Sequence, residues 1–150
     1  MKELTLSQIA AWCGADVPEG CGETRITGVE SDSRAIAPGN LFIALKGERV
    51  DGHDFLGAAA KNGAAAALVE HPVETGLPCL VVPDALLAYG KIAAGYRQLL
   101  GLKVIGITGS VGKTTTKEMT ACVLQGQFRT ARTDGNHNNN LGLPMSILHI

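Results

Sequence analysis

The feature that most constrains this chain is a glycine-rich run placed between an apolar segment and a helical pattern. Residues 103–108 are apolar and largely β-branched, which predicts a buried strand. After Gly112, Met119, Val123 and Leu124 recur on one side of a predicted helix. Glycine lets successive backbone N–H groups turn toward one anion, and the helix start adds the positive end of its dipole. A strand, a glycine loop and a helix in this order predict a cradle for a nucleoside triphosphate.

The loop follows a shorter pattern than the commonest phosphate-binding sequence. Ile107 stands where G-x-x-x-x-G-K-[ST] requires glycine, so the match is to G-x-x-G-K-T. Lys113 is a point charge suited to the β- and γ-phosphates, and the Thr114 hydroxyl suits Mg²⁺. The alternative is an ordinary strand-to-helix turn with glycine at its bend. The predicted phosphate-contacting residues are Gly109, Ser110, Val111, Gly112, Lys113, Thr114 and Thr115.

Composition narrows the class of protein. Of the 150 residues, 45% are hydrophobic and 18% are charged, so a packed globular core is expected. A net charge of −1 makes nucleic acid and anionic membranes poor candidates for a partner. The start carries no signal segment, and no apolar run reaches membrane-spanning length, so we expect a cytoplasmic protein without membrane insertion. The four cysteines form no C-x-x-C pair, which favours reduced thiols over a zinc site.

Helix and strand signals recur along the chain, and from about residue 41 onward they alternate. Thr5 and Gln8 form a capping-box pattern before a helix that ends at Gly14. Further helices are expected over residues 55–61, capped by Asp54 or Asp51, and over residues 85–100, capped by Asp84. Strands are expected over residues 26–29, 41–45, 64–69 and 79–82. This alternation predicts a parallel sheet.

The organisation that follows is an α/β fold in two parts. A small amino-terminal α/β domain is expected over residues 1–83. The beginning of a P-loop, mostly parallel-sheet ATP-binding domain is expected over residues 84–150. Residues 101–150 leave room for only two strands and two helices, too few for an open sheet with both faces covered. The second domain is therefore expected to be incomplete in this chain.

Three segments in family order resemble the Mur ligases, which add amino acids to the nucleotide precursor of peptidoglycan. Residues 105–119 resemble the ATP loop of these enzymes, and residues 32–34 with 39–64 resemble their amino-terminal domain. Residues 135–144, GNHNNNLGLP, resemble the asparagine-rich segment of the member that joins D-alanyl-D-alanine to UDP-N-acetylmuramoyl-tripeptide. Family members have about three domains. The resemblance therefore implies an amino-terminal fragment, whose remaining Mg²⁺ ligands, carbamylated lysine and carboxy-terminal domain would follow residue 150.

The resemblance also implies a reaction. A family ligase transfers the γ-phosphate of ATP to a carboxylate of the nucleotide-peptide, and an amine then displaces phosphate from the acyl phosphate. Two anions must approach each other, so positive charge is needed at the γ-phosphate. The resemblance makes Lys113 the catalytic residue and Thr114 the metal ligand, with ATP and Mg²⁺ as cofactors. The expected partners are the two substrates, UDP-N-acetylmuramoyl-tripeptide and D-alanyl-D-alanine. The protein is expected to be a monomer.

Candidate substrate residues lie in three polar segments, each with a structural alternative. Residues 31–34 form either a solvated turn with an Asx-type bond or, as the resemblance favours, a turn that binds the uridine diphosphate. Lys46 is either a ligand at a strand exit or a surface lysine. The asparagine cluster is either a polar loop or a substrate contact, and His53 beside Asp54 is interpreted as loop-fixing rather than acid–base. The predicted set is Ser31, Asp32, Ser33, Arg34, Lys46, Gly47, Asn138 and Asn139.

Three rival functions stay open at this point. A sister ligase of the same family adds the third amino acid of the peptide, and the asparagine segment argues against it. A P-loop kinase or GTPase would explain the loop alone, but it leaves the first eighty residues unexplained and the chain has no N-K-x-D sequence. A non-catalytic fragment that only binds the UDP-sugar is the third.

Overall fold

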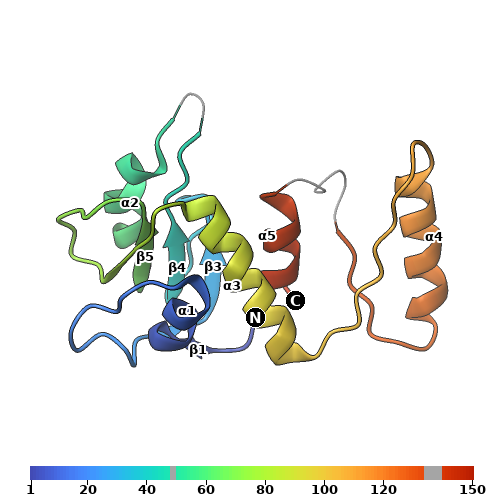
Figure 1. Ribbon diagram of the computed structural model, residues 1–150, viewed down its shortest axis with the longest axis horizontal. Coiled ribbons are helices and arrows are strands. Elements are labelled where there is room, and N and C mark those ends of the chain that lie inside the picture. The colour runs from blue at the N-terminus through green and yellow to red at the C-terminus, as the bar shows by residue number, and fades with distance from the viewer. Residues whose placement is uncertain (48–49, 134–139) are drawn as a thin grey trace.

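Four parallel strands form the centre of the structure, a computed structural model that describes residues 1–47, 50–133 and 140–150. The strand order β3-β4-β5-β6 follows the chain, and each strand pairs in parallel with the next. This arrangement confirms the predicted α/β class and its parallel sheet (Figure 1). The strands are β3 (Gly28–Glu30), β4 (Asn40–Ile43), β5 (Ala66–Val69) and β6 (Cys79–Val81).

Helices cover both faces of this sheet. Alternate residues of β4 point to opposite sides, so Leu41 and Ile43 join one core while Phe42 joins the other. The first core is completed by α1 (Leu6–Cys13) and α3 (Ala85–Leu100), and the second by α2 (Leu56–Lys61). Burial on both faces explains why β4 and β5 read as continuous apolar runs.

The helix ends confirm the capping residues expected from the sequence. The Thr5 hydroxyl accepts the N–H of Gln8, and the Gln8 side chain accepts the N–H of Thr5. Asp84 accepts the N–H of Leu87 at the start of α3. Asp51 caps the 3-10 helix η1 (Gly52–Phe55), which leads into α2. The helix expected over residues 55–61 is therefore observed as α2, and the tighter helical turn η1 directly precedes it.

The strand expected over residues 26–29 is wrong as a single element, because the chain changes sheets there. β1 (Leu4–Thr5) and β2 (Arg25–Ile26) form a separate antiparallel pair. At Thr27 the backbone N–H turns to the carbonyl of Gly39, and β3 then begins beside β4. Gly39, in the turn just before β4, has a φ of 89°, a left-handed conformation that favours glycine.

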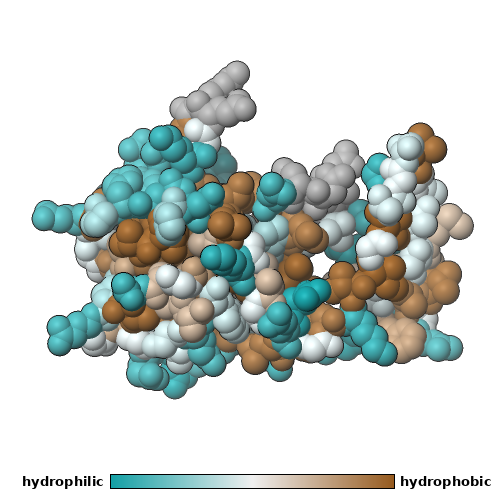
Figure 2. Space-filling view, viewed as in Figure 1, coloured by the Kyte–Doolittle hydropathy of each residue, from teal (hydrophilic) through white to brown (hydrophobic). Residues whose placement is uncertain are grey.

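The buried strand expected over residues 103–108 is also wrong. This segment has no regular strand structure, and Val104 and Ile105 are 58% and 62% exposed. A strand needs neighbours for its N–H and C=O groups, and no strand pairs with this segment within the described residues. Exposed apolar side chains continue along α4 (Lys113–Gln125), which buries only Ala121 and stands apart from the sheet (Figures 1 and 2).

The last helix, α5 (Gly142–Leu148), returns to the first part of the molecule. It packs beside α3 and against β3, and Leu148 is 1% exposed within the core that α1 and α3 share. Helix α3 itself contributes six buried residues to that core. The domain division at residues 83 and 84 stays a prediction.

Two glycines of α3 provide a matched test of this packing. A Cβ on Gly95 would overlap the indole ring of Trp12, whereas a Cβ on Gly90 would meet nothing within 4 Å. Alanine favours helices over glycine by about 1 kcal/mol, so Gly90→Ala is expected to stabilise the protein by about 0.5–1 kcal/mol. Gly95→Ala is expected to destabilise it by about 1–3 kcal/mol, because the indole must move. Urea unfolding measures both, and equal shifts would contradict the α1–α3 contact.

Candidate functional site

The glycine loop has the backbone geometry that anion binding requires. Gly112 lies at φ 78° and Gly109 at φ 152°, conformations that L side chains rarely adopt. Helix α4 begins at Lys113, and its N-cap Gly112 supplies no side-chain acceptor. The first backbone N–H groups of α4 therefore face the loop without partners from the helix. This geometry fits a phosphate group.

The Lys113 ammonium lies over this loop. Its Nζ donates a hydrogen bond to the carbonyl oxygen of Gly109, 2.6 Å away. The side chain thus folds back from the first turn of the helix toward the start of the glycine run. Thr114 and Thr115 follow in the same turn, and Ser110 and Val111 lie between the glycines. The structure therefore brings the predicted phosphate-contacting residues into one loop and helix start.

A charged cluster beyond the loop was not expected from the sequence. Arg132 Nε lies 2.6 Å from Glu118 Oε2, and Lys117 Nζ lies 3.3 Å from Glu118 Oε1. Lys117 also donates to the carbonyl of Thr133. These contacts tie the chain just before residue 134 to helix α4. Glu118 lies within α4 and Arg132 follows the end of that helix, so no pattern within one helical turn could have paired them.

The carboxyl ends of the parallel strands gather the other predicted residues at one edge of the sheet. Residues 31–34 follow β3 directly, and Lys46 and Gly47 follow β4. In an open parallel sheet this edge is where ligands bind. The structure thus places these six predicted residues at neighbouring strand ends. Asn138 and Asn139 lie outside the described residues.

The turn after β3 contains an internal ion pair. The Asp32 carboxylate accepts the Arg34 backbone N–H at 3.0 Å and receives two guanidinium hydrogen bonds at 2.9 and 2.7 Å. The Arg34 hydrogen bonds lower the pKa of Asp32 to about 2. The Asx-type bond of the structural alternative is therefore present. Both side chains remain exposed, while Ser33 is buried and its carbonyl accepts the Asn62 amide.

The segment after β4 folds back on itself. Lys46 forms an isolated antiparallel bridge with Asp51, and the Gly47 N–H donates to the carbonyl of Val50 at 2.9 Å. Lys46 and Gly47 are both exposed. A Cβ on Gly52 would lie 2.6 Å from the Leu45 nitrogen, so the return strand passes too close for any other residue. The turn thus holds Lys46 at the sheet edge with its side chain in solvent.

His53 fixes this edge, which confirms the loop-fixing interpretation. Its Nε2 accepts the Glu70 backbone N–H at 3.0 Å, so the proton sits on Nδ1, which lies 2.6 Å from Asp51 Oδ1. The ring also stacks on His71, with centroids 4.3 Å apart. The Glu70 carboxylate accepts the first N–H of α3, from Ala85. One chain of hydrogen bonds therefore joins the ends of β4 and β5 to the start of α3.

Acid is expected to loosen this edge. Hydrogen bonds from His53, the backbone N–H first, hold the pKa of Asp51 below its ordinary 3.8. A lowered native pKa contributes stability that is complete above the ordinary pKa and is lost as pH falls through the native one. Asp51→Asn should therefore flatten the fall of the urea midpoint below roughly pH 4. The neighbouring Asp54→Asn serves as control, and parallel profiles for wild type and Asp51→Asn would contradict the contact.

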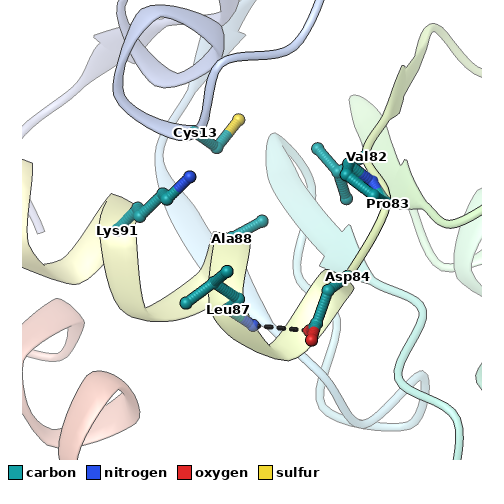
Figure 3. A pocket seen from close by; sticks show the side chains of 7 residues that line it. All are labelled: Cys13, Val82, Pro83, Asp84, Leu87, Ala88 and Lys91. Carbon is teal, nitrogen blue, oxygen red and sulfur yellow. Dashed lines mark hydrogen bonds between the residues drawn. The ribbon is translucent and has the colours of Figure 1, made fainter.

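A small hollow elsewhere in the structure does not coincide with these residues. It lies between the end of α1, the end of β6 and the start of α3 (Figure 3). Its volume of about 30 Å³ is far below the roughly 300–1,000 Å³ of pockets that hold cofactors. Burial raises the pKa of the Cys13 thiol on its wall, which makes that thiol less reactive. The hollow is lined by Cys13, Val82, Pro83, Asp84, Leu87, Ala88 and Lys91.

Two general properties complete the description. The four cysteines, all within the described ranges, are unpaired. Among the helices of the described segments, none combines the length and the apolar character needed to cross a membrane.

Comparisons with known proteins relate this chain to one family of enzymes. The family described as "Mur ligase family, catalytic domain" matches residues 25–110, and "Mur ligase middle domain" matches residues 107–150. The UDP-N-acetylmuramoyl-tripeptide–D-alanyl-D-alanine ligase of Escherichia coli K12 is 44% identical over 150 residues, which are 100% of this chain and 33% of that protein. The chain thus spans about a third of the length of such relatives.

Solved structures show the same fold. Crystal structure I of MurF from Acinetobacter baumannii has a TM-score of 0.93 at 39% identity and covers 100% of this chain and 34% of its own. MurF from Thermotoga maritima, solved in complex with ADP, has a TM-score of 0.75 at 36% identity and covers 81% of this chain and 28% of its own. Because a family match extends over more than half of the residues, the chain belongs to the Mur ligase family.

Proposed function

We propose that this chain is the amino-terminal part of an ATP-dependent ligase that adds D-alanyl-D-alanine to UDP-N-acetylmuramoyl-tripeptide. The observation that carries the proposal is the geometry of the glycine loop. Gly112 has a left-handed backbone, α4 begins without a side-chain cap, and the Lys113 ammonium donates to the Gly109 carbonyl at the start of the loop. A relative that shares this fold was solved with ADP, and the E. coli relative carries the name of this reaction. These two facts support ATP as the nucleotide and the dipeptide as the amine substrate.

The phosphate loop would act by position and charge. The N–H groups of residues 109–115 would bind the β- and γ-phosphates, and Lys113 would neutralise charge as the substrate carboxylate approaches. The Thr114 hydroxyl is the Mg²⁺ ligand that this chain would provide. ATP supplies the phosphoryl group that turns a carboxylate into an acyl phosphate, from which an amine can displace phosphate. Helix and loop hold these groups before the substrate arrives, so little reorganisation is needed.

The sheet edge would bind the UDP portion of the substrate. Ser31, Asp32, Ser33 and Arg34 follow β3, and Lys46 and Gly47 follow β4, at the edge that parallel sheets use for ligands. Arg34 must exchange part of its Asp32 contact to take a phosphate, and the high exposure of both side chains keeps this exchange inexpensive. Asn138 and Asn139 are proposed as further substrate contacts from the family resemblance. Residues 1–83 and 84–150 are the proposed UDP-substrate and ATP-binding units of a cytoplasmic monomer.

Titration calorimetry of this chain separates the proposal from its rivals. UDP-N-acetylmuramoyl-tripeptide and Mg-ATP are added separately to the wild-type chain. Binding of both supports the ligase assignment, and binding of the UDP-sugar alone supports a fragment with only the first function. Failure of the UDP-sugar to bind overturns the substrate site. A full-length enzyme carrying this chain, assayed with D-alanyl-D-alanine against a single diamino acid, decides the peptide specificity.

A further inference from the structure

Helix α5 lies near the end of the chain, yet it packs against the core that α1 and α3 share. Leu148 is 1% exposed among residues of α1, α3 and the sheet, and Met145 and Ile147 pack against the same core. Helix α4, which precedes α5 in the chain, buries only Ala121. The packing therefore fixes residues 141–150 to α3 and β3, whatever holds the rest of the second half.

At the end of α5 a polar contact reaches the candidate substrate edge. His149 Nε2 lies 2.9 Å from Glu30 Oε1, although the two residues are 119 positions apart. Glu30 is the last residue of β3 and directly precedes Ser31, the start of the candidate UDP-binding turn. The side chains are 20% and 49% exposed, so the pair adds little stability on its own. The contact matters because it fixes the side chain of the last residue of β3.

The charge of Glu30 also acts on a buried phenol of α3, that of Tyr89. Tyr89 is fully buried, and its hydroxyl has no hydrogen-bond partner within the described part of the chain. Burial first, and the nearby Glu30 carboxylate second, raise the pKa of Tyr89, so the phenol stays neutral and keeps its proton to donate. The His149 imidazole is thus a side-chain partner that holds the Glu30 carboxylate, while the Tyr89 hydroxyl makes no hydrogen bond to it.

We propose that Glu30 is a positioning residue through which helix α5 sets the conformation of the turn at residues 31–34. His149 holds the Glu30 side chain from one side, and the backbone of Glu30 leads directly into that turn. A change in the position of α5, which follows the asparagine segment, is thereby passed to the substrate edge of the first domain. The inference rests on the proposed function, because it assigns the turn to the UDP-sugar.

A double-mutant cycle on this chain tests the link. Glu30→Ala, His149→Ala and the double variant are titrated with UDP-N-acetylmuramoyl-tripeptide. Each single change is expected to raise Kd about five-fold, and the double variant is expected to bind no more weakly than Glu30→Ala, because coupled residues are not additive. Glu30→Gln, which keeps a hydrogen-bonding group, should recover most of the affinity. Glu3→Ala removes the comparable 2.7 Å pair with Arg25 in the two-stranded sheet and should leave Kd unchanged.

The outcomes separate this inference from the proposed function. Additive effects of the two alanine changes, or a Kd for His149→Ala equal to that of Glu3→Ala, would overturn the link while the UDP-sugar site stands. If the wild-type chain binds no UDP-sugar, the substrate assignment fails, and ¹⁵N amide spectra decide the link alone. Shifted backbone signals of residues 31–34 in His149→Ala, but not in Glu3→Ala, support it. Unshifted signals overturn it.

Discussion

Lys113→Ala in a full-length enzyme carrying this chain is expected to abolish ligation while the first domain stays folded. The lysine ammonium lies over the glycine loop and is the cation that would meet the γ-phosphate. Removing a preorganised charge from a reaction centre costs about 10²–10³ in rate, and loss of phosphate binding adds to this. We expect a fall in kcat/KM of at least about 1,000-fold. Release of inorganic phosphate and formation of the amide product measure the loss.

The control for this prediction is a second lysine that is exposed and far from the loop. Lys91 lies on α3 beside the small hollow, and Lys91→Ala should keep wild-type turnover. Circular dichroism and the urea midpoint should agree for wild type and both variants, because Lys113 is exposed and contributes no core packing. Lys113→Ala with wild-type turnover would remove the assigned role and with it the main support for the ligase proposal.

Leu68→Ala is expected to have the largest effect on stability. Leu68 lies on β5, one of the two central strands, is fully buried and packs in the core that α1 and α3 share. Truncation of a buried leucine costs about 2–5 kcal/mol, from lost burial and the cavity that is left. That is a large share of the roughly 5–15 kcal/mol by which domains are stable. Urea unfolding of the whole chain should show a lower midpoint with an unchanged slope.

Val81 provides the matched comparison on the neighbouring strand. It pairs in register with Val69, but its side chain is 41% exposed. Val81→Ala should cost less than about 1 kcal/mol, because little apolar surface leaves the core and no cavity forms. Similar losses for the two variants would show that β5 does not lie between two covered faces.

Local signals explain why most elements of the first hundred residues were predictable from the sequence. Thr5 with Gln8 and Asp84 before α3 are capping patterns that act within one turn, so the sequence alone locates them. The apolar runs of β4 and β5 are continuous because both faces of the sheet are covered. The glycine loop was equally local, since its backbone geometry depends on glycines three positions apart.

The features that sequence reasoning missed all depend on distant partners. Residues 103–108 have the composition of a strand, but no neighbour within the described residues completes a ladder with them. The split at Thr27 depends on the carbonyl of Gly39, which belongs to the turn before β4. The contact between Glu30 and His149 joins residues 119 positions apart, and nothing in either local sequence indicates it. Propensity predicts local conformation, and tertiary pairing decides the rest.

The position of α5 has a consequence for the reach of the phosphate loop. Helix α3 ends at Leu100 and α5 begins at Gly142, and both are fixed to the same folded body. The chain between these two helices is therefore anchored at both of its ends. Tethering of this kind limits the volume that a segment can explore and raises the local concentration of its groups near the anchor points. The backbone amides of residues 109–115 therefore stay within the reach that the two connecting segments allow, whether or not a ligand is bound.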